Sequence, residues 1–211
     1  MGALKLLFLA VALALSAPAA AGPLDRWSDH IAEASARFGV PEEWIRRVMQ
    51  AESGGRTHLN GRPIVSHAGA MGLMQLMPGT WRETRALLGL DADPHDPRDN
   101  ILAGTFYLRA MYDRFGYPGL FAAYNAGPAR YAEHLAGRRR LPGETVAYVS
   151  AVSGSGAAAP DMSVSRPQAA AAPALFALRR NTAPLAAAGD NAAPSAASMS
   201  LFVPLGGGVP R

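Results

Sequence analysis

Prolines open and glycines close a series of segments in which apolar residues recur at helical spacing. The first covers residues 25–38 and closes at Gly39, and the second runs from Pro41 to about Ser53. Further helices are expected over residues 78–88, 97–115, 118–125, 128–135 and 142–152. Proline suits the first turn of a helix because its missing N–H would have no partner there, and glycine suits the end. The pattern predicts a mainly α-helical unit.

One segment predicts β-structure. Asn60-Gly61 is typical of the turn of a β-hairpin, and it lies between His58-Leu59 and Pro63-Ile64-Val65. Proline has no N–H to donate to a neighbouring strand, so we expect at most a small hairpin.

The two ends of the chain differ from this helical unit. Residues 1–21 combine Lys5, an apolar run over residues 6–15 and the small residues Ala19-Ala20-Ala21. This order is typical of a bacterial secretory signal peptide cleaved before Gly22, and an uncleaved membrane anchor is the alternative. Residues 153–211 are rich in Ala, Pro, Ser and Gly and are predicted to be a disordered tail. Residues 22–152 would then form one domain, exported to the periplasm or outside the cell.

Composition excludes several classes of function. The chain has no cysteine, which excludes disulfides and cysteine-based metal sites. Without Lys5, nineteen arginines face sixteen acids, and this small, scattered excess does not indicate a nucleic-acid partner. The spacing of His58 and His67 fits no standard set of metal ligands, so we expect neither metal nor cofactor.

Glu52 has an unusual place on the second predicted helix. It follows Ile45, Val48 and Met49 by seven, four and three residues, so its carboxyl should lie on their apolar face in the last helical turn. Desolvation and the negative end of the helix dipole should both raise its pKa. A carboxyl that is protonated near neutral pH can act as a general acid. The alternative is a solvated glutamate at a frayed helix end.

Five motifs follow one another in a recognisable order. They include Glu-Ser-Gly at 52–54, Gly-Leu-Met-Gln at 72–75 and Ala-Tyr-Asn-Ala-Gly-Pro at 123–128, with further matches at residues 100–108 and 144–149. Together they resemble the soluble lytic transglycosylase (SLT) family, relatives of goose-type lysozyme, over residues 26–152. The resemblance implies a lysozyme-like α (α+β) fold with a groove for peptidoglycan glycan strands.

The resemblance also implies the reaction. Such enzymes cleave the β-1,4 bond between N-acetylmuramic acid and N-acetylglucosamine without water and leave a 1,6-anhydro ring. By its match to the Glu-Ser motif, Glu52 would be the catalytic acid/base. Substrate-assisted enzymes do not need the usual pair of carboxylates, and Glu144 is the one further acid in the matched motifs.

Six residues are implied to contact the substrate: Ser53, Met74, Gln75, Tyr124, Asn125 and Tyr148. Met74 and Gln75 would line the groove, whereas Met71 and Met77 are expected in the core. Tyr148 would place its phenol close to Glu52, and a plain core tyrosine is the alternative.

Two other functions stay open at this point. One is a muramidase in which the same acid acts with water, and the other is a non-catalytic glycan-binding or assembly factor of an envelope-spanning secretion or conjugation machine. In each case we expect a monomer whose partner is peptidoglycan. The link over residues 55–65 is longer than in many relatives, so its contact with substrate stays open too.

Overall fold

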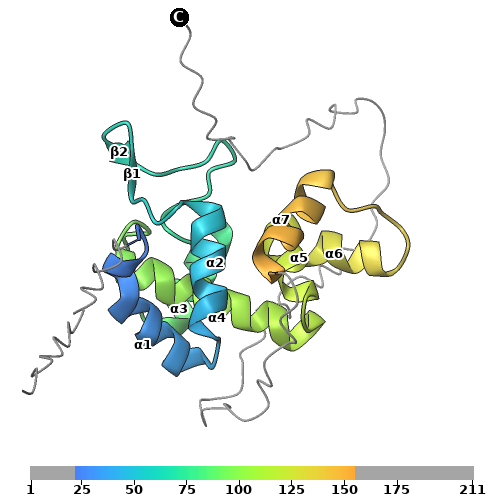
Figure 1. Ribbon diagram of the computed structural model, residues 1–211, viewed down its shortest axis with the longest axis horizontal. Helices are drawn as coiled ribbons and strands as arrows, with labels where there is room; N and C mark the ends of the chain where they lie inside the picture. Colours follow the sequence, from blue (N-terminus) through green and yellow to red (C-terminus); the bar gives the residue numbers. More distant parts are fainter. Residues whose placement is uncertain (1–21, 155–211) are drawn as a thin grey trace, which may run out of the picture.

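The computed structural model describes residues 22–154, so the predicted signal peptide and nearly all of the predicted tail lie outside the described residues. The elements in chain order are η1 (Asp25–Trp27), α1 (Ser28–Phe38), α2 (Glu42–Glu52), β1 (His58–Leu59), β2 (Arg62–Pro63), α3 (Pro78–Leu88), α4 (Pro97–Phe115), α5 (Gly119–Ala126), α6 (Pro128–Leu135) and α7 (Gly143–Ser153). Figure 1 shows their arrangement. The prediction of a mainly α fold with one small hairpin is confirmed.

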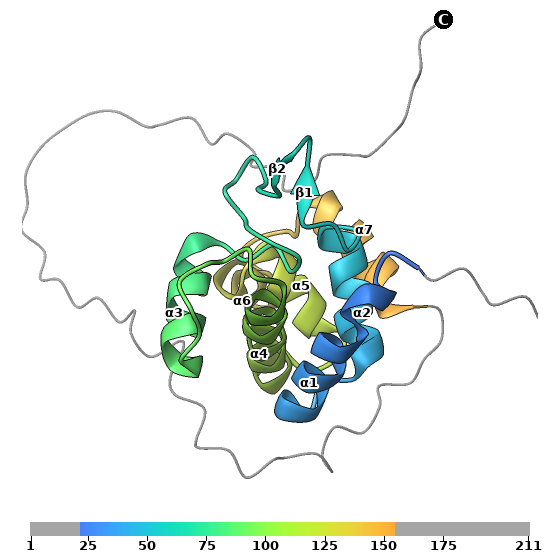
Figure 2. The same cartoon turned by 90° about the vertical axis from the view of Figure 1, so that its left-hand side faces the viewer.

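Helix α4 is the centre of the fold. It packs against α1, α3 and α5, and Figure 2 shows it between α3 and the α1–α2 pair. Its residues Ile101, Leu102, Leu108 and Met111 have no exposed surface. On the other side, α5 also contacts α6 and α7, and α7 packs against α2. The core therefore continues from α4 through α5 and α7 to α2, which ends at Glu52.

Local sequence signals set the ends of the helices. Gly39 and Gly89 end α1 and α3 with φ of 63° and 67°, a left-handed conformation that glycine adopts without steric cost. Asp96 caps α4 by accepting a hydrogen bond from the Asp99 N–H at 2.9 Å. Pro41, expected as the first residue of its helix, is the residue before it, because its ψ of 133° is extended.

The predicted hairpin forms at the expected turn. His58 pairs with Pro63 and Leu59 with Arg62 in antiparallel register. Asn60 and Gly61 have φ of 52° and 75°, as a tight hairpin turn requires. The hairpin lies beyond the end of α2 at which Glu52 is found (Figure 1).

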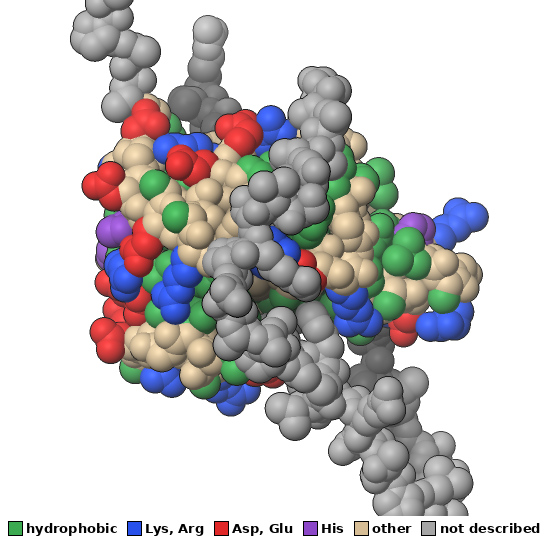
Figure 3. All heavy atoms as spheres, turned by 90° about the horizontal axis from the view of Figure 1, so that it is seen from below, with side chains coloured by type: hydrophobic (Ala, Val, Ile, Leu, Met, Phe, Trp, Pro, Cys, Tyr) green, Lys and Arg blue, Asp and Glu red, His purple; other side chains and the backbone are tan. Residues whose placement is uncertain are grey.

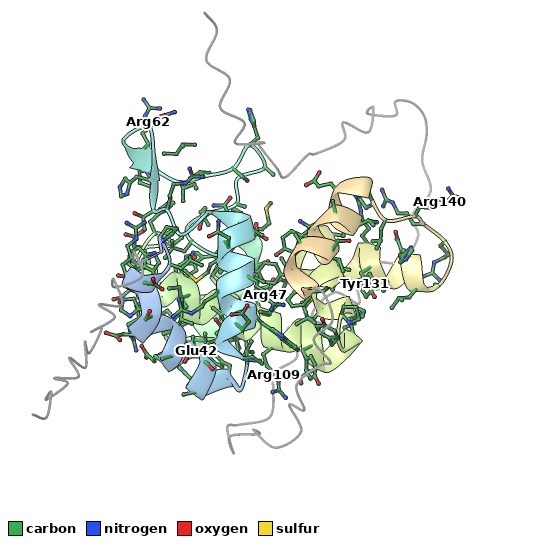
Figure 4. The ribbon with its side chains drawn as sticks, in the orientation of Figure 1. Glu42, Arg47, Arg62, Arg109, Tyr131 and Arg140 are labelled. Carbon is green, nitrogen blue, oxygen red and sulfur yellow. The ribbon has the colours of Figure 1, made fainter. Side chains whose placement is uncertain are left out.

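The surface carries charges of both signs. Acidic and basic side chains are interspersed over the face shown in Figure 3, and Arg140, in the loop between α6 and α7, stands away from the body in Figure 4. Within residues 22–154, no helix is both long enough and apolar enough to cross a membrane.

Candidate active site

Glu52 is the last residue of α2 and is half-buried. The residues before it on the same face, Ile45, Val48 and Met49, have no exposed surface. The predicted position of the carboxyl, at the end of an apolar helix face, is thus the observed one. The frayed, solvated alternative does not describe this glutamate.

The Glu52 carboxyl has a tyrosine partner that is distant in the sequence. The Tyr148 hydroxyl on α7 donates to Oε1 of Glu52 at 2.9 Å. Burial raises the pKa of Glu52 to about 8, the Tyr148 hydrogen bond lowers it, and the charge of Glu144 raises it. The pKa rise expected from the sequence is confirmed, and desolvation is its largest cause. At neutral pH most of this carboxyl holds its proton.

Ser53 holds the C-terminal end of α2 in place through its side chain. Its side chain is buried, and Oγ lies 2.8 Å from the carbonyl oxygen of Leu73 and 3.2 Å from that of Met49. Oγ also accepts a hydrogen bond from the Gly55 N–H at 3.2 Å. These contacts tie the helix end that carries Glu52 to the Gly-Leu-Met-Gln segment. We therefore assign Ser53 a positioning role, and a contact with substrate stays a prediction.

Asn100 holds the Gly-Leu-Met-Gln segment on α4. Its Oδ1 accepts from the Met74 N–H at 2.7 Å, and its Nδ2 donates to the carbonyls of Met71 and Pro94 at 3.1 and 2.8 Å. A Cβ at Gly72 would lie 2.6 Å from Cγ of Asn100, so only glycine fits there. Sequence reasoning included Asn100 in a motif but gave it no role. The available signal was an amide directly before the apolar run that begins at Ile101.

The structure places Met74 in the core rather than in the lining of a groove. Its side chain has no exposed surface, and a Cβ at Gly104 of α4 would lie only 2.5 Å from its Cβ. Met77, expected in the core, is 41% exposed. The groove position of Met74 was implied by the family resemblance, and the core position of Met77 by its helical spacing from Met71. Residues 71–77 instead form turns with short bridges that join Met71 to Val65 and Leu76. Met74 therefore packs in the hydrophobic core.

Gln75 has a backbone conformation that is rare for its type. Its φ is 47°, in the left-handed region, and its Nε2 donates to the Gly72 carbonyl at 2.9 Å. Such a residue costs about 1 kcal/mol or more and is found preferentially at functional sites. The residue is half-buried.

Helix α5 brings Tyr124 and Asn125 to the same region. The buried Tyr124 hydroxyl donates to the Met74 carbonyl at 2.7 Å. Burial, followed by the nearby charge of Glu52, raises the pKa of Tyr124 well above its usual value. The Nδ2 of Asn125 is buried and has no hydrogen-bond partner within residues 22–154. An unpaired buried donor is costly, and an oxygen of a bound ligand would satisfy it.

The arrangement suits acid/base chemistry by a carboxyl. Glu52, Tyr124 and Tyr148 lie together, with Gln75 beside them in the segment that Ser53 and Tyr124 both bind. In the described part of the chain, no group of three or more His, Asp or Glu side chains could hold a metal ion.

Comparison with known proteins gives one consistent family. The model of the transglycosylase SLT domain matches residues 29–146. The soluble lytic murein transglycosylase of Escherichia coli (strain K12) is 35% identical over 123 residues, which are 54% of this chain and 18% of that protein. The transglycosylase of Enterobacteria phage PRD1 is 31% identical over 129 residues, or 61% of this chain and 45% of that protein. This chain thus matches less than half the length of these curated relatives.

Solved structures show the same fold. The 70-kDa soluble lytic transglycosylase of Escherichia coli matches with a TM-score of 0.52 and 31% identity, over 62% of this chain and 24% of that chain. An inactive variant of the lytic transglycosylase Slt from Pseudomonas aeruginosa matches with a TM-score of 0.51 and 29% identity, over 61% of this chain and 24% of that one. The lysozyme-like fold is confirmed. Because the family model matches more than half of the sequence, the chain belongs to the transglycosylase SLT domain family.

Proposed function

We propose that this protein is a peptidoglycan lytic transglycosylase in which Glu52 is the catalytic acid/base. The observation that carries the proposal is a carboxyl with a pKa of about 8 that accepts a hydrogen bond from Tyr148. The names of the relatives, as murein transglycosylases, support the substrate class. The inactive relative from Pseudomonas aeruginosa carries glutamine in place of a glutamate, which supports a role for a glutamate in the reaction.

One carboxyl performs both proton transfers in the proposed reaction. Protonated Glu52 donates its proton to the β-1,4 glycosidic oxygen as the bond from C1 of N-acetylmuramic acid breaks, and N-acetylglucosamine leaves with a free hydroxyl. The Glu52 carboxylate then takes the proton of the C6 hydroxyl, whose oxygen bonds to C1. This step closes the 1,6-anhydro ring, consumes no water and restores protonated Glu52.

The surrounding residues favour both forms of the acid. Burial holds the proton on Glu52 before bond cleavage, and the Tyr148 hydroxyl stabilises the carboxylate that exists between the two transfers. We further propose that Gln75, Tyr124 and Asn125 face the reacting sugars, with the unpaired Nδ2 of Asn125 donating to a sugar oxygen. A peptidoglycan substrate and the predicted signal peptide both support a periplasmic location.

The test is mass spectrometry of the products released from purified sacculi by the protein comprising residues 22–211. Muropeptides one water lighter than hydrolysis products are expected, and the Glu52→Gln variant should release none. Reducing-end products of full mass would show a muramidase instead. Sacculus binding without any release would favour the non-catalytic glycan-binding factor.

A further inference from the structure

Helices α2 and α7 run antiparallel and are joined by two side-chain contacts. Glu52 meets Tyr148 at one, and Arg47 meets the carbonyl of Ser153 at the other. Five residues separate the contacts on each helix, a rise of about 7.5 Å at 1.5 Å per residue. The two contacts therefore keep the same spacing along both helices.

Arg47 binds the C-terminal end of α7. Its Nη1 donates to the carbonyls of Ser153 and Val152 at 3.0 and 3.4 Å, and the Tyr117 hydroxyl donates to the same Ser153 carbonyl at 2.9 Å. The last carbonyls of a helix lack partners within it and carry the negative end of its dipole, so a guanidinium suits them. Figure 4 shows Arg47 between α2 and α7.

The guanidinium also packs against the backbone that follows α7. A Cβ at Gly154 would lie 2.9 Å from Cζ and 3.1 Å from Nη2 of Arg47, and Gly154 has a φ of 72°. Only a residue without a side chain leaves this space for the arginine. On its other side, Nε of Arg47 donates to Oε1 of Glu43 at 2.7 Å.

We propose that Arg47 is a positioning residue for the acid: by fixing the end of α7 on α2, it holds the Tyr148 hydroxyl on Glu52 and keeps water from the carboxyl. This inference rests on the proposed function of the same site. Apart from burial, the groups that shift the pKa of Glu52 are Tyr148 and Glu144, and both lie on α7. From α5, Tyr124 is close enough for the charge of Glu52 to raise its pKa. Both groups that shift Glu52 therefore come from the helix that Arg47 holds.

The direction in which the pKa of Glu52 changes distinguishes this role from the loss of a single hydrogen bond. Release of α7 would admit water, and burial is the largest cause of the raised pKa of Glu52, so the pKa should fall toward 4.5. Loss of the Tyr148 hydrogen bond alone should raise the pKa further, because that bond lowers it.

The first test is a ¹³C NMR titration of the glutamate carboxyls in the protein comprising residues 22–211, with Glu52→Gln to assign the signal. In Arg47→Met, the pKa of Glu52 should fall by about one unit or more, and kcat at pH 8 should fall by about tenfold with KM unchanged. Glu43→Gln is the matched control, since it removes the ion pair of Arg47 but leaves the contact with α7. An unchanged Glu52 pKa in Arg47→Met, even with a lower Tm, would overturn the proposal.

A second pair of variants leaves Arg47 in place. Gly154→Ala should displace the guanidinium and lower the pKa of Glu52. Gly137→Ala also adds a side chain at a positive φ, of 69°, but in open space, and should leave that pKa unchanged. Equal effects of the two variants would contradict the proposal. The titration needs no activity, so the positioning role can hold or fail independently of whether sacculi are cleaved.

Discussion

The Tyr148 hydroxyl donates to Oε1 of Glu52 at 2.9 Å, although the two residues are 96 positions apart in the chain. Burial stabilises the protonated form of the glutamate, and this hydrogen bond stabilises the charged form. An acid that must also act as a base needs both forms within reach near neutral pH. The opposition of these two effects is the physical basis of the predictions for this site.

Replacing Tyr148 with phenylalanine should raise the pKa of Glu52 above about 8, because the carboxylate loses its donor. We expect a rise of about one unit and a fall in kcat of about tenfold or more, since the carboxylate formed after bond cleavage is less stable. NMR titration and the pH dependence of anhydro-muropeptide release measure these effects. A lower pKa would contradict this prediction and would show that removing the hydroxyl mainly admits water to the carboxyl.

Replacing Glu144 with glutamine should have the opposite effect. The charge of Glu144 raises the pKa of Glu52, so its removal should lower that pKa by up to about one unit. The alkaline limb of the pH–rate profile should then move to lower pH. Glu133→Gln on α6 is a suitable control, because Glu133 is not among the groups that shift Glu52. An equal shift in both variants would indicate a general change in charge.

The approach of α4 to the Gly-Leu-Met-Gln segment can be tested by adding one methyl group. In Gly104→Ala the new Cβ would lie 2.5 Å from Cβ of Met74, so the variant should lose about 1–3 kcal/mol of unfolding free energy despite the higher helix propensity of alanine. Gly79→Ala in α3 meets no atom within 4 Å and should gain about 0.5–1 kcal/mol. Urea denaturation measures both. A stabilised Gly104→Ala would show that the segment moves aside easily.

Much of the fold was predictable because its signals are local. Proline and aspartate at helix starts and glycine at helix ends act within one turn, and Asn60-Gly61 fixes its own hairpin. The place of Glu52 followed from helical periodicity, which holds inside a regular helix. These features depend on neighbours in the sequence, so the sequence displays them directly.

The errors and omissions concern contacts between distant segments. Met74 was expected in the groove from the family resemblance, and no local pattern in the sequence shows that Gly104 on α4 leaves space for its side chain. The role of Asn100 depends on three backbone groups from two other segments. In the sequence nothing distinguishes Arg47 from a surface arginine, because its contact with the end of α7 depends on the packing of two helices that are distant in the chain. Such roles follow from packing, which periodicity cannot supply.

The cost of keeping Glu52 protonated should appear as pH-dependent stability. Its pKa is about 8 in the folded protein and near 4.5 as an ordinary carboxyl, so between these values the folded state holds a proton that the unfolded state loses. The stability present below pH 4.5 should therefore fall by up to about 1.4 kcal/mol per pH unit until pH 8, and then level off. Glutamine cannot ionise, so Glu52→Gln should match the original protein near pH 4 and exceed it by about 2–4 kcal/mol at pH 8.

Urea denaturation of both proteins at pH 4, 6 and 8 measures this difference. Glu83→Gln, on the exposed surface of α3, is the control and should show little change in the difference with pH. A constant difference between Glu52→Gln and the original protein at all three values would mean that the carboxyl is hydrated in the folded state. The general acid would then have an ordinary pKa in the free protein, and substrate binding would have to raise that pKa for the acid to be protonated at neutral pH. A difference that grows with pH instead shows that the fold itself holds the proton ready for transfer, at a cost in stability that this site retains.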